Sequence, residues 1–211
     1  MYIKSNKRKL QAQETKKKIF DVAHQKFREK GFNNVTIEEI AESAEISVGS
    51  LYHHFKNKYE LLIAWHDRLD ELYSSYYEKL TTSPEFKDKN TLEIIKEMML
   101  YMNETCIYYG AEYIGVIYSY MLSNSDFAKI MTDRRRTYFK IMTNLMKEGQ
   151  KKGEIRKDIP VKQLVTDITI ISRGCLTDWA IEGSPDDMRT HTTSVLSCYL
   201  RGIVSTSADK K

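Results

Sequence analysis

Apolar residues recur at intervals of three and four positions along most of the chain, which is the spacing of one face of an α-helix. The most regular stripe is made by six residues: Leu92, Ile95, Met99, Met102, Cys106 and Tyr109. Only 9 glycines and 3 prolines interrupt the pattern in 211 residues, too few for the many turns of a β-sandwich. The pattern therefore predicts an all-α protein with about nine helices.

Capping and breaking residues predict four helices in the first part of the chain. Thr36 and Glu39 form a capping-box pattern, in which a hydroxyl and a carboxylate satisfy free amides at a helix start. The predicted boundaries are a first helix that begins between Gln11 and Thr15 and ends at Gly31, a short helix from Thr36, another from Ser47, and a longer one from Asn57 towards Leu80. The two short helices meet at a tight corner, which is the arrangement of a helix-turn-helix.

Glycines divide the rest of the chain. After a loop at residues 81–90, we expect helices that end at Gly110, Gly153 and Gly183, with one long helix running from Asn124 or Ser125 to Gly153. Ser184 and Pro185 provide a cap and a first-turn proline for the last helix. The predicted architecture is a three-helix N-terminal head followed by a larger helical body.

Residues 36–55 carry the most specific signal. They contain Thr36-Ile37 at the start of the second helix, Ala44-Glu45-Ile46-Ser47 at the corner, and Gly49-Ser50-Leu51-Tyr52-His53-His54-Phe55 followed by Lys58 and Leu61. Over about residues 12–62 this sequence resembles the TetR family of bacterial one-component repressors, with Glu45 where the family often has glycine. The resemblance implies a helix-turn-helix DNA-binding domain at residues 1–57 and a helical ligand-binding and dimerisation domain at residues 58–211.

The helix after Ser47 is expected to enter the major groove of DNA, while the helix before it lies across the phosphate backbone. Gly49 would let the helix backbone approach DNA closely, and Val48 offers an apolar contact to a thymine methyl group. The family positions imply phosphate contacts for Tyr52 and His54, with partial core packing as the alternative for Tyr52. The predicted DNA-binding residues are Thr36, Ser47, Val48, Gly49, Ser50, Tyr52, His53, His54 and Lys58.

Charge is distributed unevenly along the chain, which the net value of +4 conceals. Of 33 Lys and Arg and 29 Asp and Glu, the first 60 residues hold 12 and 8, so residues 61–211 hold 21 of each. A basic head on a neutral body predicts a different partner for each part. The runs Lys7-Arg8-Lys9 and Lys16-Lys17-Lys18 are either a solvated tail or an arm that adds sequence-independent attraction to DNA.

Composition and motifs exclude several other classes. A hydrophobic content of 41% and a charged content of 29% fit a soluble globular protein, and no apolar stretch is long enough to predict a membrane span. The basic N-terminus lacks the apolar run of a secretory signal, so we expect a cytoplasmic protein. Cys106, Cys175 and Cys198 lack metal-site spacing. No glycine-rich phosphate loop, HExxH pair or serine elbow occurs, so we predict no enzyme, cofactor or metal site.

Methionine and tyrosine residues concentrate between positions 98 and 120, where they suit either a ligand pocket or an ordinary core. As a pocket lining they would accept an aromatic, cationic or lipophilic small-molecule effector. Asp178, Glu112 or Arg173 would supply a polar anchor. The predicted ligand-binding residues are Trp65, Met98, Tyr101, Met102, Tyr109, Tyr113, Ile117, Tyr120, Tyr138, Met142, Asp178 and Trp179.

Helix-turn-helix proteins usually pair two heads to read half-sites about 34–36 Å apart, so the body is expected to form a homodimer. The family resemblance also implies an interface made by the last two helices, whose apolar stripes agree with it. The predicted interface residues are Leu164, Ile168, Ile171, Cys175, Met188, Thr192, Val195 and Tyr199. The alternative is that these stripes pack inside the core of a single chain.

Together these features predict a homodimeric transcriptional repressor that binds a palindromic operator in double-stranded DNA. A small molecule that binds the body would shift the two heads and release the operator. Two alternatives stay open. One is a small-molecule binding or carrier protein with a vestigial head, and the other is a regulator that senses oxidation through Cys106 or Cys175.

Overall fold

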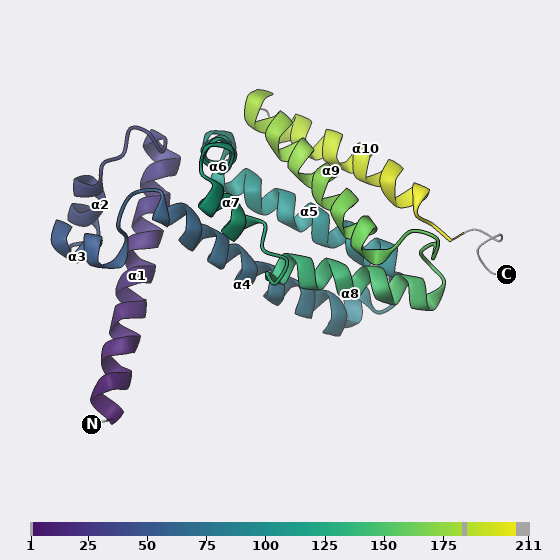
Figure 1. The fold of residues 1–211 in the computed structure, drawn as a ribbon, viewed down its shortest axis with the longest axis horizontal. Coiled ribbons are helices and arrows are strands. Elements are labelled where there is room, and N and C mark those ends of the chain that lie inside the picture. The colour runs from purple at the N-terminus through teal and green to yellow at the C-terminus, as the bar shows by residue number, and fades with distance from the viewer. Residues whose placement is uncertain (1, 183–184, 206–211) are drawn as a thin grey trace. The chain divides into compact units, whose positions relative to one another are not determined.

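A computed structural model describes residues 2–182 and 185–205. These residues form an all-α fold, as predicted, with ten α-helices rather than about nine (Figure 1). The helices are α1 Tyr2–Lys30, α2 Ile37–Ser43, α3 Val48–His54, α4 Glu60–Thr82, α5 Thr91–Tyr109, α6 Ala111–Ser123, α7 Ser125–Met131, α8 Thr137–Lys152, α9 Val161–Glu182 and α10 Pro185–Gly202, with a short 3-10 helix, η1 Pro84–Phe86. In this part of the chain no helix has the length and apolar content to cross a membrane.

The chain forms two compact units. The first comprises the residues up to Asp67 together with Ser119–Met131, and the second comprises Arg68–Tyr118 together with the residues from Thr132 onwards. In the first unit α2 packs against both α1 and α3 (Figure 1). Ile19 and Phe27 of the predicted α1 stripe are buried, as are Ile40 of α2 and Leu51 of α3. The head therefore has an apolar core of its own.

The caps predicted for the short helices are confirmed. The Thr36 hydroxyl accepts the Glu39 amide at 3.1 Å, and the Glu39 carboxylate accepts the Thr36 amide at 3.1 Å, which completes the capping box of α2. Ser47 caps α3 through a bond from the amide of Ser50, and Asn57 accepts the amide of the first α4 residue. These side chains fix where each helix starts, because they satisfy amides that have no partner within the helix.

The corner between α2 and α3 places a non-glycine residue in the left-handed region. Glu45 has φ +56°, a conformation in which a Cβ meets the following carbonyl and which glycine adopts without that cost. Its carboxylate accepts a hydrogen bond from Lys18 at 2.7 Å. The departure from the family pattern noted at this position therefore coincides with a strained backbone.

In the second unit α5, α8, α9 and α10 pack on one another. α10 lies along α9 and also contacts α5, while α8 packs against both α5 and α9 (Figure 1). The facing stripes are apolar: Leu164 and Ile168 of α9, and Leu196 of α10, are fully buried. An Asn90–Glu93 capping box sets the start of α5.

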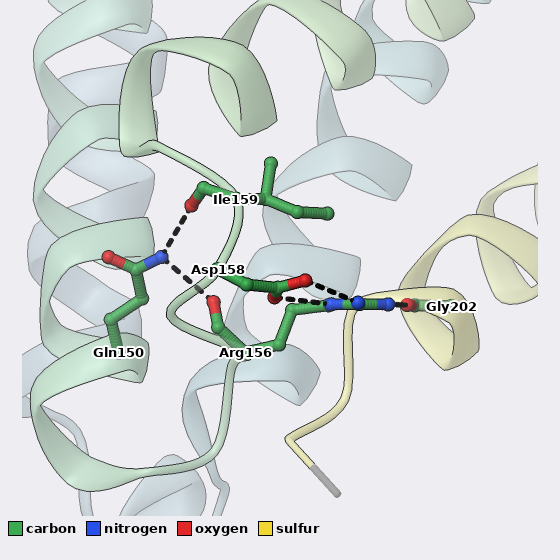
Figure 2. Close-up of polar contacts among 5 residues, drawn as sticks. All are labelled: Gln150, Arg156, Asp158, Ile159 and Gly202. Carbon is green, nitrogen blue, oxygen red and sulfur yellow. Dashed lines mark hydrogen bonds and ion pairs between the residues drawn. The ribbon is translucent and has the colours of Figure 1, made fainter. Parts of the chain in front are cut away.

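The turn between α8 and α9 is tied to the end of α10 (Figure 2). The Gln150 amide donates to the carbonyls of Arg156 and Ile159, each at 2.8 Å. The Arg156 guanidinium donates to the Asp158 carboxylate and, at 3.4 Å, to the carbonyl of Gly202. The end of α10 is thus held by a side-chain bond and by backbone bonds. Ile155 and Val204 form an isolated antiparallel bridge, in which the Arg156 amide donates to the Ile203 carbonyl at 3.0 Å.

Two predicted helix boundaries are wrong. α1 begins at Tyr2 and not between Gln11 and Thr15, because residues 2–10 contain no glycine or proline to end the helix. The long helix predicted from Asn124 or Ser125 to Gly153 is two helices, α7 and α8. Asp133 accepts bonds from the amide and guanidinium of Arg135, and these local bonds replace the helical ladder there. The stops at Gly31, Gly110 and Gly153 are confirmed, while Gly183 and Ser184 lie outside the described residues.

Candidate functional site

α3 contributes one buried side chain to the head, that of Leu51, and leaves its other positions accessible. The predicted DNA-binding residues all keep accessible surface: Thr36, Ser47, Gly49, Tyr52 and His53 are exposed, and Val48, Ser50, His54 and Lys58 are half-buried. The structure thus brings Ser47–His54 together as one accessible helix, with Thr36 at the start of the helix before it.

Gly49 is not explained by the packing of the chain itself. A Cβ built at this position has the Ser47 Oγ as its nearest neighbour, 4.0 Å away, so the fold leaves room for a side chain. A glycine within a helix costs about 0.5–1 kcal/mol relative to alanine. A glycine that is neither crowded nor in a special conformation suits a helix whose backbone another surface approaches closely.

The C-terminal end of α3 gathers hydrogen-bond donors. Tyr52 is 47% exposed, and the rings of His53 and His54 meet edge to face. Desolvation, helped by His53 and the Lys16 ammonium, lowers the pKa of His54. α3 itself contains no acidic residue. This surface therefore presents phenol, imidazole and ammonium groups of the kind that bind phosphate oxygens.

Lys58 has a structural role in addition to the predicted phosphate contact. Its ammonium donates to the carbonyls of Phe32 at 2.7 Å and Val35 at 3.0 Å, and it lies 4.4 Å from the centre of the Phe32 ring. Desolvation lowers the pKa of Lys58. Two of the three ammonium hydrogens hold the loop between α1 and α2, so a phosphate contact would use the third.

Thr36 is also committed to local structure. Its hydroxyl oxygen accepts the Glu39 amide, and the Glu39 carboxylate is bound by Lys30 at 2.6 Å, which lowers the pKa of Glu39. The Thr36 hydroxyl hydrogen is not used by the cap. It is the donor that a phosphate oxygen would accept, so the predicted contact is compatible with the capping box.

The second unit has a group of polar side chains in its interior, which we call the tyrosine cluster: Tyr73, Cys106, Tyr118 and Tyr138. They come from α4, α5, α6 and α8, and they interact with one another electrostatically. Tyr138 lies 3.0 Å from the Thr169 hydroxyl, which donates to the carbonyl of Val165. Because that hydroxyl hydrogen is used, Tyr138 is the donor.

The four side chains of the tyrosine cluster carry no charge at neutral pH, and the charged groups lie next to the cluster. Desolvation raises the pKa of the Cys106 thiol to about 12 and raises the pKa of Tyr73, Tyr118 and Tyr138, so all four groups are neutral at neutral pH. The positive charge of Arg173 on α9 opposes this shift at Tyr118 and Tyr138. The interior therefore offers neutral donors on aromatic walls, with the guanidinium groups of Arg134 and Arg173 acting on Tyr138 and the Asp70 carboxylate acting on Tyr73. This suits an apolar molecule that carries a polar group.

Two further polar side chains of this unit lack partners. Asn103 on α5 is 2% exposed, and neither its amide nitrogen nor its amide oxygen has a hydrogen-bond partner among the described residues. The indole nitrogen of Trp179, which is 4% exposed, is also without one. Each such buried group costs about 1–3 kcal/mol when left unsatisfied. A ligand with polar atoms would satisfy them.

The residues predicted to bind a ligand are divided between the units. Trp65 and Tyr120 belong to the first unit, where Tyr120 stacks on Tyr59 with ring centres 4.1 Å apart. The second unit holds the others: Met98, Met102, Tyr109, Tyr113, Ile117, Met142 and Trp179 are buried, and Tyr101 and Tyr138 are half-buried. Asp178 lies on an exposed position of α9, although its neighbour Trp179 is buried, because successive helix residues point about 100° apart.

The sequence prediction missed Tyr73, Tyr118 and Asn103. Tyr118 lies in the Met- and Tyr-rich segment from which the prediction was made, and Asn103 interrupts an otherwise apolar helix face. A buried asparagine inside an apolar stripe is therefore the signal that was available. Tyr73 lies far from that segment in sequence, so only the packing of α4 against the other helices shows it.

The stripes predicted as the dimer interface are largely part of the chain's own core. Leu164, Ile168, Met188 and Thr192 are buried within this single chain, because α9 and α10 pack on each other and on α5 through these faces. Ile171, Cys175 and Tyr199 are half-buried, and Val195 is 44% exposed. Exposed apolar residues lie on other positions of α9, where Ile170 is 61% and Ile181 is 79% exposed.

The known proteins that this chain matches are bacterial regulatory proteins. Residues 19–65 match the family described as "Bacterial regulatory proteins, tetR family". The chain is 27% identical to the HTH-type transcriptional repressor KstR2 of Mycolicibacterium smegmatis over 91% of this chain and 92% of that protein. It is 23% identical to the fatty acid metabolism regulator protein of Bacillus subtilis over 88% and 93%. A structure of Thermus thermophilus FadR in complex with lauroyl-CoA matches with TM-score 0.68 and 15% identity over 88% and 93% of the chains, which shows a shared fold.

Proposed function

We propose that this chain, whose residues 19–65 match the tetR family of bacterial regulatory proteins, is a homodimeric repressor whose α3 reads operator DNA and whose second unit binds a lipophilic effector. We place the DNA-binding domain at residues 1–57 and the ligand-binding and dimerisation domain at residues 58–211. Effector binding shifts the population of two body conformations, and the heads of the dimer then no longer match the operator spacing.

The observation that carries the DNA-binding proposal is the surface of α3. It combines an uncrowded Gly49 with an exposed Tyr52, two histidines and no acidic side chain. Short side chains at its N-terminal end, Ser47 to Ser50, leave space for base edges. Phenol and ammonium groups at the other end suit the phosphate backbone, which fixes the helix in the groove.

A gel-shift experiment with DNA from upstream of the protein's own gene tests this proposal. Tyr52→Phe removes one phosphate donor, so we expect operator affinity to fall about threefold to tenfold, the worth of one hydrogen bond. Tyr108→Phe alters an exposed tyrosine of α5 and serves as the matched control. A protein that shifts no candidate operator at low salt would be a carrier rather than a repressor.

The effector proposal rests on the interior of the second unit. Asn103 and Trp179 bury polar atoms that no described residue satisfies, and the tyrosine cluster adds neutral donors near Arg173. Large apolar side chains are buried on the same helices, among them Met98 and Met102 of α5 and Met142 of α8. A molecule with a long apolar body and a polar end fits this chemistry, and the fatty acid regulator of Bacillus subtilis and the lauroyl-CoA complex of FadR support the same class.

Lauroyl-CoA is the probe for this second part of the proposal. We expect it to raise the melting temperature and to release bound operator in a dose-dependent manner. Asn103→Leu replaces an unsatisfied amide with an apolar side chain of similar size, so it is expected to retain stability and to weaken the response, while Asn144→Leu on the exposed side of α8 does not. If lauroyl-CoA neither binds nor releases DNA, the effector class is wrong and the DNA-binding result stands.

The oxidation-sensing alternative is disfavoured by the cysteines themselves. The reactive form of cysteine is the thiolate, and burial raises the pKa of Cys106 to about 12. Desolvation also raises the pKa of Cys175. Both the buried Cys106 thiol and the half-buried Cys175 thiol therefore remain protonated at neutral pH, which is the less reactive form.

A further inference from the structure

The second unit contains a cavity of about 550 Å³ where the end of α4, the η1 segment, the start of α5 and one side of α8 meet. Small-molecule sites typically have volumes of about 300–1,000 Å³. None of the residues predicted from the sequence to bind a ligand lines this cavity, and neither Asn103 nor any member of the tyrosine cluster does. It is therefore separate from the proposed effector site.

The floor of the cavity is apolar. Leu80, Ile94 and Leu145, from α4, α5 and α8, line it and are 2%, 8% and 6% exposed. The rings of Tyr77 and Phe86 add aromatic wall, and both keep accessible surface. A hydrocarbon chain placed on this floor would lose its contact with water, which favours binding.

The rim of the cavity is positively charged. Three lysines and one glutamate line it: Lys87, Lys89, Lys152 and Glu148. Lys89 is neutralised by Glu97 at 2.6 Å, whereas Lys87 and Lys152 are exposed cations. Without Lys89, the two cations Lys87 and Lys152 outweigh the single anion Glu148, so the mouth of the cavity favours an anion.

Thr91 supplies an unused hydroxyl inside the cavity. This residue lines the cavity and is 3% exposed, and its Oγ1 has no hydrogen-bond partner among the described residues. Its amide is already bound by Glu154 at 2.9 Å, so the hydroxyl is the group that remains. Tyr77 stays protonated, because desolvation and the charge of Glu148 raise its pKa, and is a second neutral donor.

We propose that this cavity binds an amphipathic organic anion, with the apolar chain on Leu80, Ile94 and Leu145 and the anionic group between Lys87 and Lys152. The Thr91 hydroxyl donates to the bound molecule. The anionic group is a carboxylate or a phosphate ester, which share charge and acceptor oxygens. This site does not depend on the DNA-binding or effector proposals, because its residues belong to neither.

Methyl-group NMR of the full-length protein tests the proposal, with decanoate, decyl phosphate and decyltrimethylammonium as probes. We expect decanoate, decyl phosphate or both to shift the Leu80, Ile94 and Leu145 methyl signals saturably, and the one that does so identifies the anionic group. The cation should bind at least about tenfold more weakly, because it meets two lysines instead of two counter-charges. Equal binding of the cation, or shifts confined to other methyl groups, would overturn the proposal.

Variants of the rim lysines distinguish recognition of the anionic group from nonspecific apolar binding. Lys87→Glu with Lys152→Glu reverses both rim charges and is expected to weaken the binding anion at least about tenfold. Lys151→Glu makes the same change one residue away on α8, outside the cavity lining, and should leave affinity unchanged. Thr91→Val should weaken binding about threefold without lowering the melting temperature, since it removes a hydroxyl that the fold does not use. Unchanged affinity in the double variant would refute the site.

Discussion

Gly49 affects two properties of α3: the stability of the helix and how closely DNA can approach its backbone. Gly49→Ala should raise the free energy of unfolding by about 0.5–1 kcal/mol, because alanine is the better helix former and no atom lies closer than 4.0 Å to its Cβ. The same methyl group should weaken operator binding at least about tenfold if the helix backbone lies against DNA. Urea unfolding and gel shifts measure the two effects.

The control for Gly49→Ala is Gly115→Ala, on α6 in the second unit. A Cβ at Gly115 would lie 3.8 Å from the Ala180 Cβ, an ordinary van der Waals contact, so the helix should gain stability in the same way without touching the head. Opposite signs of the stability and binding effects at Gly49 alone would identify it as a contact position. Loss of both stability and binding would instead mean that Gly49 is needed for the fold.

His24 makes the stability of the head depend on pH. It is 6% exposed beside Phe20 and Phe27, and desolvation, with the charge of Arg28, lowers its pKa from 6.5 to about 3. The unfolded chain therefore binds a proton that the folded head excludes. Stability from this group is complete above pH 6.5 and is lost as the pH falls towards 3, by about 2 kcal/mol at pH 5.

Hydrogen exchange of α1–α3 amides, corrected for intrinsic rates, measures this loss between pH 7 and pH 5. His24→Phe keeps an aromatic ring in the core and removes the titration, so its protection should change less over that interval. His191→Gln, at an exposed position of α10, should retain the dependence of the wild-type head. A head equally protected at both pH values would show that His24 is not excluded from protonation.

The corner between α2 and α3 is the element where this sequence departs from the tetR pattern that it otherwise resembles. Glu45→Gly should raise the free energy of unfolding by about 1 kcal/mol, because glycine adopts φ +56° without the clash of a Cβ. The lost Lys18–Glu45 pair offsets little of this gain, since both side chains are largely exposed.

Glu45→Gln distinguishes the two contributions, because it removes the charge and keeps the Cβ. It should change stability by less than about 0.5 kcal/mol in a thermal or urea unfolding experiment. If Glu45→Gly and Glu45→Gln destabilised the head by similar amounts, the ion pair and not the backbone would govern the corner.

Helix boundaries marked by a capping motif or a glycine were predictable, and a boundary that neither marks was not. The capping box at Thr36 and the glycine stops at Gly31 and Gly110 are encoded within a few residues and were confirmed. The break between α7 and α8 depends on how Asp133 bonds Arg135, for which no glycine or proline gives a signal. The accessible surface of α3 follows from one short segment and was predictable for the same reason. The tyrosine cluster is assembled from four helices and was not.

On the scale of the whole molecule, the excess of positive charge lies in the head, and the body has no net charge. We therefore expect the head to recognise its partner mainly through charge and the body mainly through shape. The body has 21 residues of each sign beyond position 60, so its partners are selected by apolar surface and by a few polar groups. One such surface lies on α9, where Ile170 and Ile181 are 61% and 79% exposed on either side of Gly174. Because these two isoleucines share a face of α9 with Gly174, this face suits contact with a second helix, which glycine allows to approach closely.

We therefore expect Ile170→Asp with Ile181→Asp to convert the proposed dimer to a monomer, raising its dissociation constant at least about a hundredfold, the worth of two buried isoleucines. Because both side chains are exposed in the single chain, the melting transition of the monomer should remain cooperative. Ile130→Asp on α7, also an exposed isoleucine, is the matched control and should remain dimeric. Light scattering reports the mass, and a double variant that stays dimeric would place the interface elsewhere. A monomer presents one head, so its operator affinity should collapse while its cavity still binds ligand.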